Sequence, residues 1–149
     1  MFNQRKQVIL SLLAVTFLMV GCSSEKSYIL DLSKDQPAQV ESTTMEGEFA
    51  GGMHCALMSL SFREVNLQLM AEGREDEIEG LDSDSYSQDD TPARFMVDNG
   101  KLRFLDYEQV SDKLSEESGY LFQLSGDSTM LKLTDNENGF SCLFPIKEA

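Results

Sequence analysis

The sequence predicts an all-β fold, a small antiparallel up-and-down barrel of seven to eight strands. Apolar and polar residues alternate with a period of two through much of the chain after residue 45, as in strands that bury one face. Links of hairpin length, of which Asn99-Gly100 is the strongest, join successive alternating runs. Cys55 and Cys142 fall near the first and last of these runs, where a disulfide would close the barrel.

The first two strands are predicted from the alternation in residues 58–62 and 65–69. With Arg63-Glu64 as a two-residue turn, all six apolar side chains of the two runs fall on one face of a hairpin. The competing interpretation is a single helix over residues 55–71. The serines of the first run favour strands, because they interrupt a helical apolar stripe but suit the wet face of a strand.

The remaining strands are predicted from turn signals in the C-terminal half. Asn99-Gly100 separates two alternating runs, and Gly126-Asp127 separates two more. Pro145 predicts a sheet edge or a barrel rim, since proline lacks the N–H that a central strand donates. Residues 107–117 are polar and fit a short helix or a wide loop. The strands expected in this half are residues 93–98, 101–106, 120–124, 130–133 and 140–146.

The N-terminal segment has the features of a secretory signal. Arg5 and Lys6 precede an apolar run over residues 8–20, which is shorter than the roughly 20 residues that span a bilayer. The stretch Leu18–Cys22, with Gly21 before the cysteine, resembles the lipobox of bacterial lipoproteins. That resemblance implies an acylated Cys22 inserted in the lipid bilayer. Ser23 in place of aspartate implies sorting to the outer membrane, facing the periplasm. An ordinary signal peptide or an uncleaved anchor is the alternative.

The sequence divides into three parts on this interpretation: a signal peptide over residues 1–21, a lipidated flexible tether over 22–45, and a barrel domain over 46–149. The tether is rich in serine, threonine and glutamine, which favour a flexible chain. An apolar group within it, around residues 28–32, fits a short strand or turn.

The charge of the chain is strongly acidic, with a formal value of −14. Removal of residues 1–21 takes away two basic residues and no acid, which leaves 10 basic against 26 acidic residues and a charge of −16. Nucleic-acid binding is not expected, because it needs a basic surface. A basic protein partner, cations or plain solubility are the interpretations left. In an oxidising periplasm, Cys55 and Cys142 are most simply a disulfide.

No residue constellation predicts an enzyme, a metal site or a cofactor. His54 is the only histidine, and it lies beside Cys55. Asp82-x-Asp84 has part of the spacing of a calcium loop, but Ala93 stands where the bidentate glutamate would be. An exposed, solvated acidic loop is the simpler interpretation of residues 75–90.

Short motifs in the C-terminal half resemble those of membrane-bound inhibitors of c-type lysozyme, which are small lipoprotein β-barrels. They are Ser118–Phe122, the Gly126-Asp127 turn, Leu131 and Cys142, with Cys55 as the matching first cysteine. The resemblance implies Ser115, Ser118, Tyr120 and Asp127 as candidate partner-binding residues. Ser125 stands where the family has the lysine that enters the lysozyme active site.

A second resemblance is to the amino-terminal barrel of the envelope-stress lipoprotein NlpE. Gly47–Gly51, followed by His54-Cys55-Ala56, is similar to its opening strand and cysteine segment. Met58 occupies the place of the second cysteine of that family's Cys-x-x-Cys pair, so metal or redox sensing through that pair is not expected.

Together these observations predict an outer-membrane lipoprotein with a lipocalin-like barrel. It would act as a binding module for an envelope protein or for a small apolar ligand. A lysozyme-inhibitor-like protein is one alternative, and a pilotin-type accessory lipoprotein of an envelope assembly, which requires more helix, is another. The sequence leaves open the partner's identity, the oligomeric state and whether the barrel is hollow.

Overall fold

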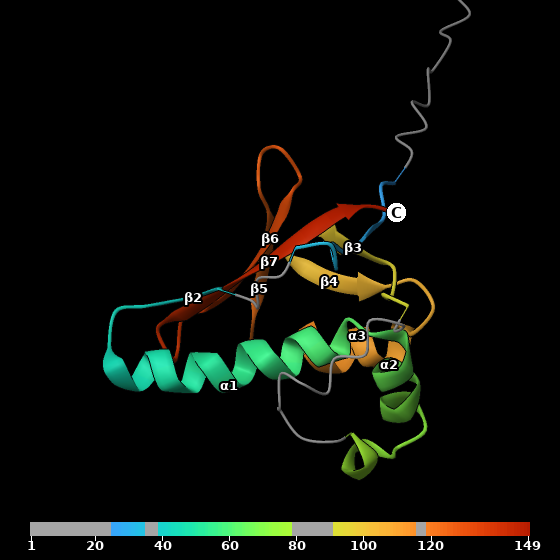
Figure 1. Cartoon of the computed structure of the whole chain (residues 1–149), viewed down its shortest axis with the longest axis horizontal. Coiled ribbons are helices and arrows are strands. Elements are labelled where there is room, and N and C mark those ends of the chain that lie inside the picture. Colours follow the sequence, from blue (N-terminus) through green and yellow to red (C-terminus); the bar gives the residue numbers. More distant parts are fainter. Residues whose placement is uncertain (1–24, 35–38, 79–90, 116–118) are drawn as a thin grey trace, which may run out of the picture.

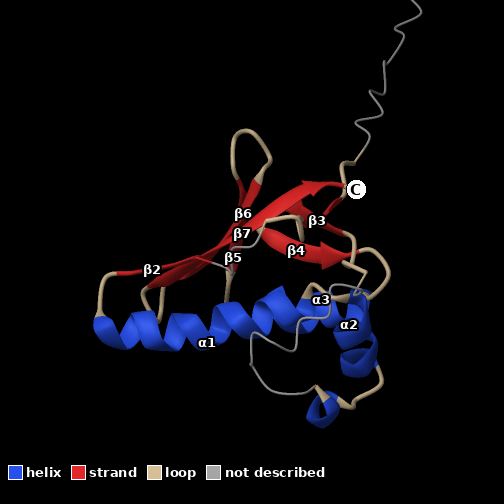
Figure 2. Cartoon of the chain, in the orientation of Figure 1, coloured by secondary structure: helices blue, strands red, loops and turns tan. Residues whose placement is uncertain are grey.

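The computed structural model describes residues 25–34, 39–78, 91–115 and 119–149. Within these residues, seven antiparallel strands form one sheet, and the helices lie along one side of it (Figure 1; Figure 2). The predicted fold class, a small antiparallel barrel-like sheet, is confirmed. The sheet remains open along its outer strands.

The element bounds are as follows. The strands are β1 (Tyr28–Leu30), β2 (Gln39–Ser42), β3 (Phe95–Asp98), β4 (Lys101–Phe104), β5 (Leu121–Leu124), β6 (Met130–Asp135) and β7 (Phe140–Glu148). The helices are α1 (Met45–Ser61), α2 (Glu64–Ala71) and α3 (Glu108–Ser115), with a 3-10 turn η1 (Glu75–Glu77). The strand order is β4-β3-β1-β7-β6-β5, and β2 also pairs with β7. The insertion of β1 between β3 and β7 departs from a simple meander.

β7 is the central strand of the sheet. One of its sides pairs with β6, and the other pairs first with β2 and then with β1. The N–H of Ile146 points toward β6 and donates to the Thr129 carbonyl (2.9 Å), so the nitrogen of Pro145 points the opposite way. It faces the junction where β7 changes partner from β2 to β1, and there the Pro145 carbonyl accepts a hydrogen bond from the N–H of Asp31 (2.9 Å). Pro145 thus lies within the central strand, and of the predicted sheet edge or barrel rim, the sheet edge is wrong.

The two outer strands approach each other at the β3–β4 turn. Asn99 and Gly100 both have positive φ, 50° and 80°, as a type I′ turn requires, which confirms the predicted hairpin. The backbone N–H of Phe122 in β5 donates to the carbonyl of Gly100 (2.8 Å). This bond links the two ends of the strand order and makes the open sheet barrel-like.

The segment before residue 45 contributes two strands. β1 pairs with β3 and β7, and β2 pairs with residues 140–143 of β7. Tyr28 and Leu30 are buried in the core, which confirms the short strand expected there. The predicted flexible tether over residues 22–45 is wrong where the structure describes it, because hydrogen bonds to β7 hold these strands in the domain.

Residues 45–71 form two helices instead of the predicted hairpin. Thr44 caps α1, since its Oγ1 accepts a hydrogen bond from the N–H of Gly47 (3.0 Å). Two glutamates occupy the first turn, where the positive end of the helix dipole stabilises acids. These signals mark the start of a helix, and Cys55 accordingly lies in α1 and not in a first strand.

Ser61 explains why the alternation was misleading. Its side chain is buried, and its hydroxyl donates to the carbonyl of Leu57 one turn earlier (3.1 Å). A serine whose hydroxyl is hydrogen-bonded in this way needs no contact with water. The serines that favoured strands over the competing helix are therefore compatible with a buried helix end.

Phenylalanine side chains fill the space between the sheet and the helices. Phe62, at the end of α1, is fully buried, and its ring centroid lies 5.0 Å from that of Phe95, 5.3 Å from that of Phe144 and 5.6 Å from that of Phe104. Helices and strands thus meet in one aromatic cluster. The fully buried phenylalanines are Phe62, Phe95, Phe104, Phe122, Phe140 and Phe144.

Substitution of Gly51 tests how closely α1 packs on the sheet. A Cβ at Gly51 would lie 2.8 Å from Val40 Cγ1 and 3.0 Å from the Phe140 side chain. We expect Gly51→Ala to lower the free energy of unfolding by about 1–3 kcal/mol, because neither neighbour can yield freely. Gly52→Ala is the matched control: no atom lies within 4 Å of its Cβ, and alanine should stabilise the helix by about 0.5–1 kcal/mol. Urea unfolding measures both, and an equal gain from the two would contradict this packing.

Candidate functional site

The disulfide joins α1 to the central strand. Cys55 and Cys142 are bonded, with their Cα atoms 5.6 Å apart, and both are buried. The predicted pairing is confirmed, but the expected join between the first and last strands is wrong. Because Cys55 lies on a helix, the bond fixes the helical layer to the sheet and does not close the barrel.

His54 and Tyr120 form a polar contact beside the disulfide. The Tyr120 hydroxyl lies 3.0 Å from His54 Nδ1, and the imidazole stacks on Phe140 with ring centroids 5.5 Å apart. Burial raises the pKa of the Tyr120 phenol, and the negative charge of Asp135 raises it further. Tyr120, a predicted partner-binding residue, is half-buried and engaged with α1.

Asp127 closes the β5–β6 turn. Its carboxylate accepts hydrogen bonds from the Ser125 hydroxyl (2.6 Å) and from the hydroxyl and backbone N–H of Thr129 (2.8 and 3.2 Å). The bond from Ser125 contributes most to lowering the pKa of Asp127. Tyr120 and Asp127 flank opposite ends of β5, so the structure does not bring these two candidate residues together.

The other predicted site residues are placed as follows. Ser115 is the last residue of α3. Ser118 and Cys22 lie outside the described residues, as do the signal peptide and most of the acidic loop. The candidate set taken from the lysozyme-inhibitor resemblance therefore does not form one surface within the described residues.

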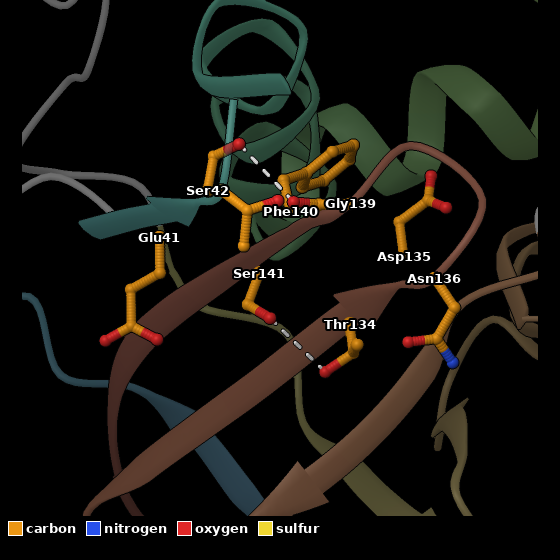
Figure 3. A pocket seen from close by; sticks show the side chains of 9 residues that line it. Glu41, Ser42, Thr134, Asp135, Asn136, Gly139, Phe140 and Ser141 are labelled. Carbon is orange, nitrogen blue, oxygen red and sulfur yellow. Dashed lines mark hydrogen bonds between the residues drawn. The ribbon is translucent and has the colours of Figure 1, made fainter. Parts of the chain in front are cut away.

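A shallow polar hollow of about 350 Å³ lies on the sheet near the β6–β7 turn (Figure 3). Ser141 of β7 donates a hydrogen bond to Thr134 of β6 (3.5 Å), and Ser42 of β2 donates to the Gly139 carbonyl (3.3 Å). The lining hydroxyls thus bond mainly within the sheet. Its full lining is Glu41, Ser42, Thr43, Thr134, Asp135, Asn136, Gly139, Phe140 and Ser141.

Asp135 is the buried acid of this hollow, and its carboxylate shapes the turn. Oδ1 accepts hydrogen bonds from the backbone N–H groups of Glu137 (2.9 Å) and Asn138 (3.0 Å), and Oδ2 accepts from the Asn138 side chain (2.7 Å). Both oxygens are therefore engaged in turn formation. This arrangement gives the carboxylate a structural role.

Among the residues that the structure describes, no three His, Cys, Asp or Glu side chains are grouped as metal ligands. In the same part of the chain, no helix combines the length and apolar character needed to cross a membrane.

The outward side of α1 carries an exposed apolar row. Met45, Phe49, Met53 and Leu57 follow one another at four-residue spacing and are 87, 76, 47 and 48 % exposed. This spacing aligns them along the helix over about 18 Å. We call these four residues the α1 ridge. Because the opposite side of the helix packs on β2 and β7, α1 is apolar on both sides, as is typical of a helix covered on both.

The α1 ridge was missed from the sequence because residues 58–69 were assigned to strands. The four-residue spacing that begins at Met45, together with the capping residue Thr44, was the signal that identifies both the helix and its exposed row.

Comparisons with protein-family models, with curated proteins and with solved structures find no match for this chain. The resemblances to lysozyme inhibitors and to NlpE therefore stay predictions from short motifs. The geometry of the described residues carries the functional argument instead.

Proposed function

We propose that the chain is an outer-membrane lipoprotein, anchored at the periplasmic face through acylated Cys22, that binds an envelope protein through its surface. The α1 ridge is the observation that carries this proposal. Exposed contiguous apolar surface on a soluble domain marks interaction sites, whereas single exposed apolar residues do not. Catalysis has no part in the proposal, because the polar groups of the larger hollow bond to their own turn and sheet.

Binding inside the barrel is less well supported than binding at the surface. Six phenylalanine side chains fill the interior, and each is essentially inaccessible to solvent. Two hollows in the described part of the chain, of about 350 and 270 Å³, open at the surface and have polar residues in their lining. A small apolar ligand needs an enclosed apolar cavity. The filled interior therefore favours a protein partner over such a ligand.

The anchor is supported by the lipobox-like stretch that ends at Cys22. Six residues lead from Cys22 to Tyr28, the first residue of β1, and an extended chain of that length reaches at most about 20 Å. The domain would thus be held close to the membrane surface, where its partner would be an envelope protein.

A pilotin-type accessory lipoprotein is the second candidate, and the helices favour it. The sequence-based prediction set this alternative aside for lack of helix, whereas α1 alone spans 17 residues. The lysozyme-inhibitor alternative gains no such support. In the β5–β6 turn, Ser125 stands at the place of the expected lysine, and its hydroxyl donates to Asp127 (2.6 Å).

Site-specific photo-cross-linking of the full chain in its own host tests the proposal. A photoreactive phenylalanine analogue replaces Phe49 in α1, Val65 in α2 or Leu121 in β5, which are all exposed. We expect one defined protein adduct from at least one position, and its loss in a Cys22→Ser variant that is no longer anchored. If no position gives an adduct while native mass spectrometry detects one apolar ligand per chain, the proposal is wrong.

A further inference from the structure

We infer that the α1 ridge binds a cationic amphipathic helix of the protein partner. This inference rests on the proposed surface-binding function and names the chemistry of the segment that is bound. It is carried by the shape of the outward side of α1 and by the charges around it.

The rows beside the α1 ridge consist mainly of small and acidic residues. One flanking row runs from Glu46 through Ala50 to the exposed His54, and the other runs from Glu48 through Gly52 to Ala56. Alanine and glycine have small side chains, which leaves room for the side chains of a facing helix to pack beside the ridge. A glutamate stands at the N-terminal end of each row, so the surface is apolar in its centre and acidic at its rim.

Basic residues are few in the sequence segment that contains α1. Residues 39–78 contain eight acidic and two basic residues. Arg63 is buried, and the guanidinium of Arg74 bonds to Glu72 (2.8 Å) and Glu77 (2.5 Å). A partner segment with lysine or arginine beside its apolar stripe complements this arrangement, and opposite charges both speed the encounter and fix its orientation.

A bilayer fits the α1 ridge less well than a cationic helix does. Figure 1 places residues 25–34, which follow the proposed anchor, beside the C-terminus, with the sheet between them and α1. The α1 ridge faces away from the sheet and thus away from residues 25–34. Anionic lipids would also repel the acidic rim.

A second copy of the chain is also a poorer occupant. Two copies would bring identical acidic rims together. In addition, a stable interface of standard size buries about 800 Å² on each partner with 20–30 residues a side, far more than one row of four side chains supplies.

A tryptophan reporter tests the inference directly. The chain contains no tryptophan, so Phe49→Trp gives a single fluorophore on the α1 ridge, and Val65→Trp gives a matched exposed reporter on α2. The full chain is placed in phosphatidylcholine nanodiscs, with empty nanodiscs as the blank. The probes are two helical 18-residue peptides with the same leucine stripe, one with lysine and one with glutamate as its polar residues.

We expect the leucine/lysine peptide to shift the emission of Phe49→Trp to the blue with saturation, and the leucine/glutamate peptide to have no effect. Leu57→Ala in the reporter background should weaken binding about tenfold, as removal of a central apolar contact does. Glu46→Gln with Glu48→Gln should weaken binding at 50 mM salt and make it less sensitive to 500 mM salt. Unchanged melting temperatures would show that these exposed substitutions leave the fold intact.

Five results would overturn the inference. Equal shifts with both peptides, or an equal shift from Val65→Trp, would mean that no specific surface exists. Quenching of Phe49→Trp by brominated phosphatidylcholine would assign the α1 ridge to the bilayer. A blue shift that grows with protein concentration alone would assign it to a second copy. A cellular cross-link at Val65 or Leu121, with no peptide binding, would reject a cationic helix as the partner of the α1 ridge. The proposed surface-binding function would then still stand.

Discussion

Removal of the Cys55–Cys142 disulfide is expected to lower the free energy of unfolding by about 4–5 kcal/mol. The two cysteines are 87 residues apart, so the bond closes a long loop and removes much of the conformational freedom of the unfolded chain. It also joins α1 covalently to β7. Domains of this size have about 5–15 kcal/mol of stability in total, so the loss is a large share of it.

Urea unfolding of the Cys22→Ser chain with and without dithiothreitol measures this effect, and intact mass after alkylation reports the state of the two remaining cysteines. Cys55→Ala with Cys142→Ala is the control, because reductant should then change nothing further. Thiols that alkylate without reductant, or equal unfolding midpoints in both conditions, would contradict the expected stabilisation.

The hairpins could be predicted because their determinants are local. Asn99 and Gly100 adopt the left-handed conformations that their residue types favour, and the turn at Gly126-Asp127 is held by contacts within a few residues. Beside these turns, β4 and β6 bury alternate side chains, as their sequence pattern indicates. The β3–β4 and β5–β6 pairs therefore follow from sequence alone.

The helical part of the chain could not be separated from strands by periodicity. The apolar pattern of residues 58–69 fits both the strand period and the helix period. The choice between strand and helix depended on whether the serines needed contact with water. Ser61 obtains its partner from the Leu57 carbonyl, a bond that exists only once the helix has formed. The cap at Thr44 was the better local signal, because it makes sense only at a helix start.

The long-range strand pairing and the candidate site could not be predicted from the sequence, for a different reason. β1 and β2 are short strands in a polar segment, and their places beside β7 are set by partners that lie more than 95 residues away. The α1 ridge likewise becomes visible only when the opposite side of the helix is known to pack on the sheet. The cysteine pairing was predictable because only two candidates remained after Cys22 was assigned to the lipid anchor.

Phe62→Ala is expected to lower the free energy of unfolding by about 3–5 kcal/mol. The ring is fully buried and contacts Phe95, Phe104 and Phe144, so truncation leaves a cavity at the point where α1 meets β3, β4 and β7. Surrounding aromatic side chains are held by the sheet and can collapse into that space only in part.

Phe49→Ala is the matched control, because it makes the same chemical change within α1 at a side chain that is 76 % exposed, whereas Phe62 directly follows that helix. We expect it to change stability by less than about 0.5 kcal/mol. Urea unfolding of both variants measures the difference. Equal losses would mean that Phe49 is buried in the folded chain, and the α1 ridge would then be part of the core and unavailable to a partner. A large loss for Phe62→Ala alone keeps the aromatic cluster as the core and the α1 ridge as surface.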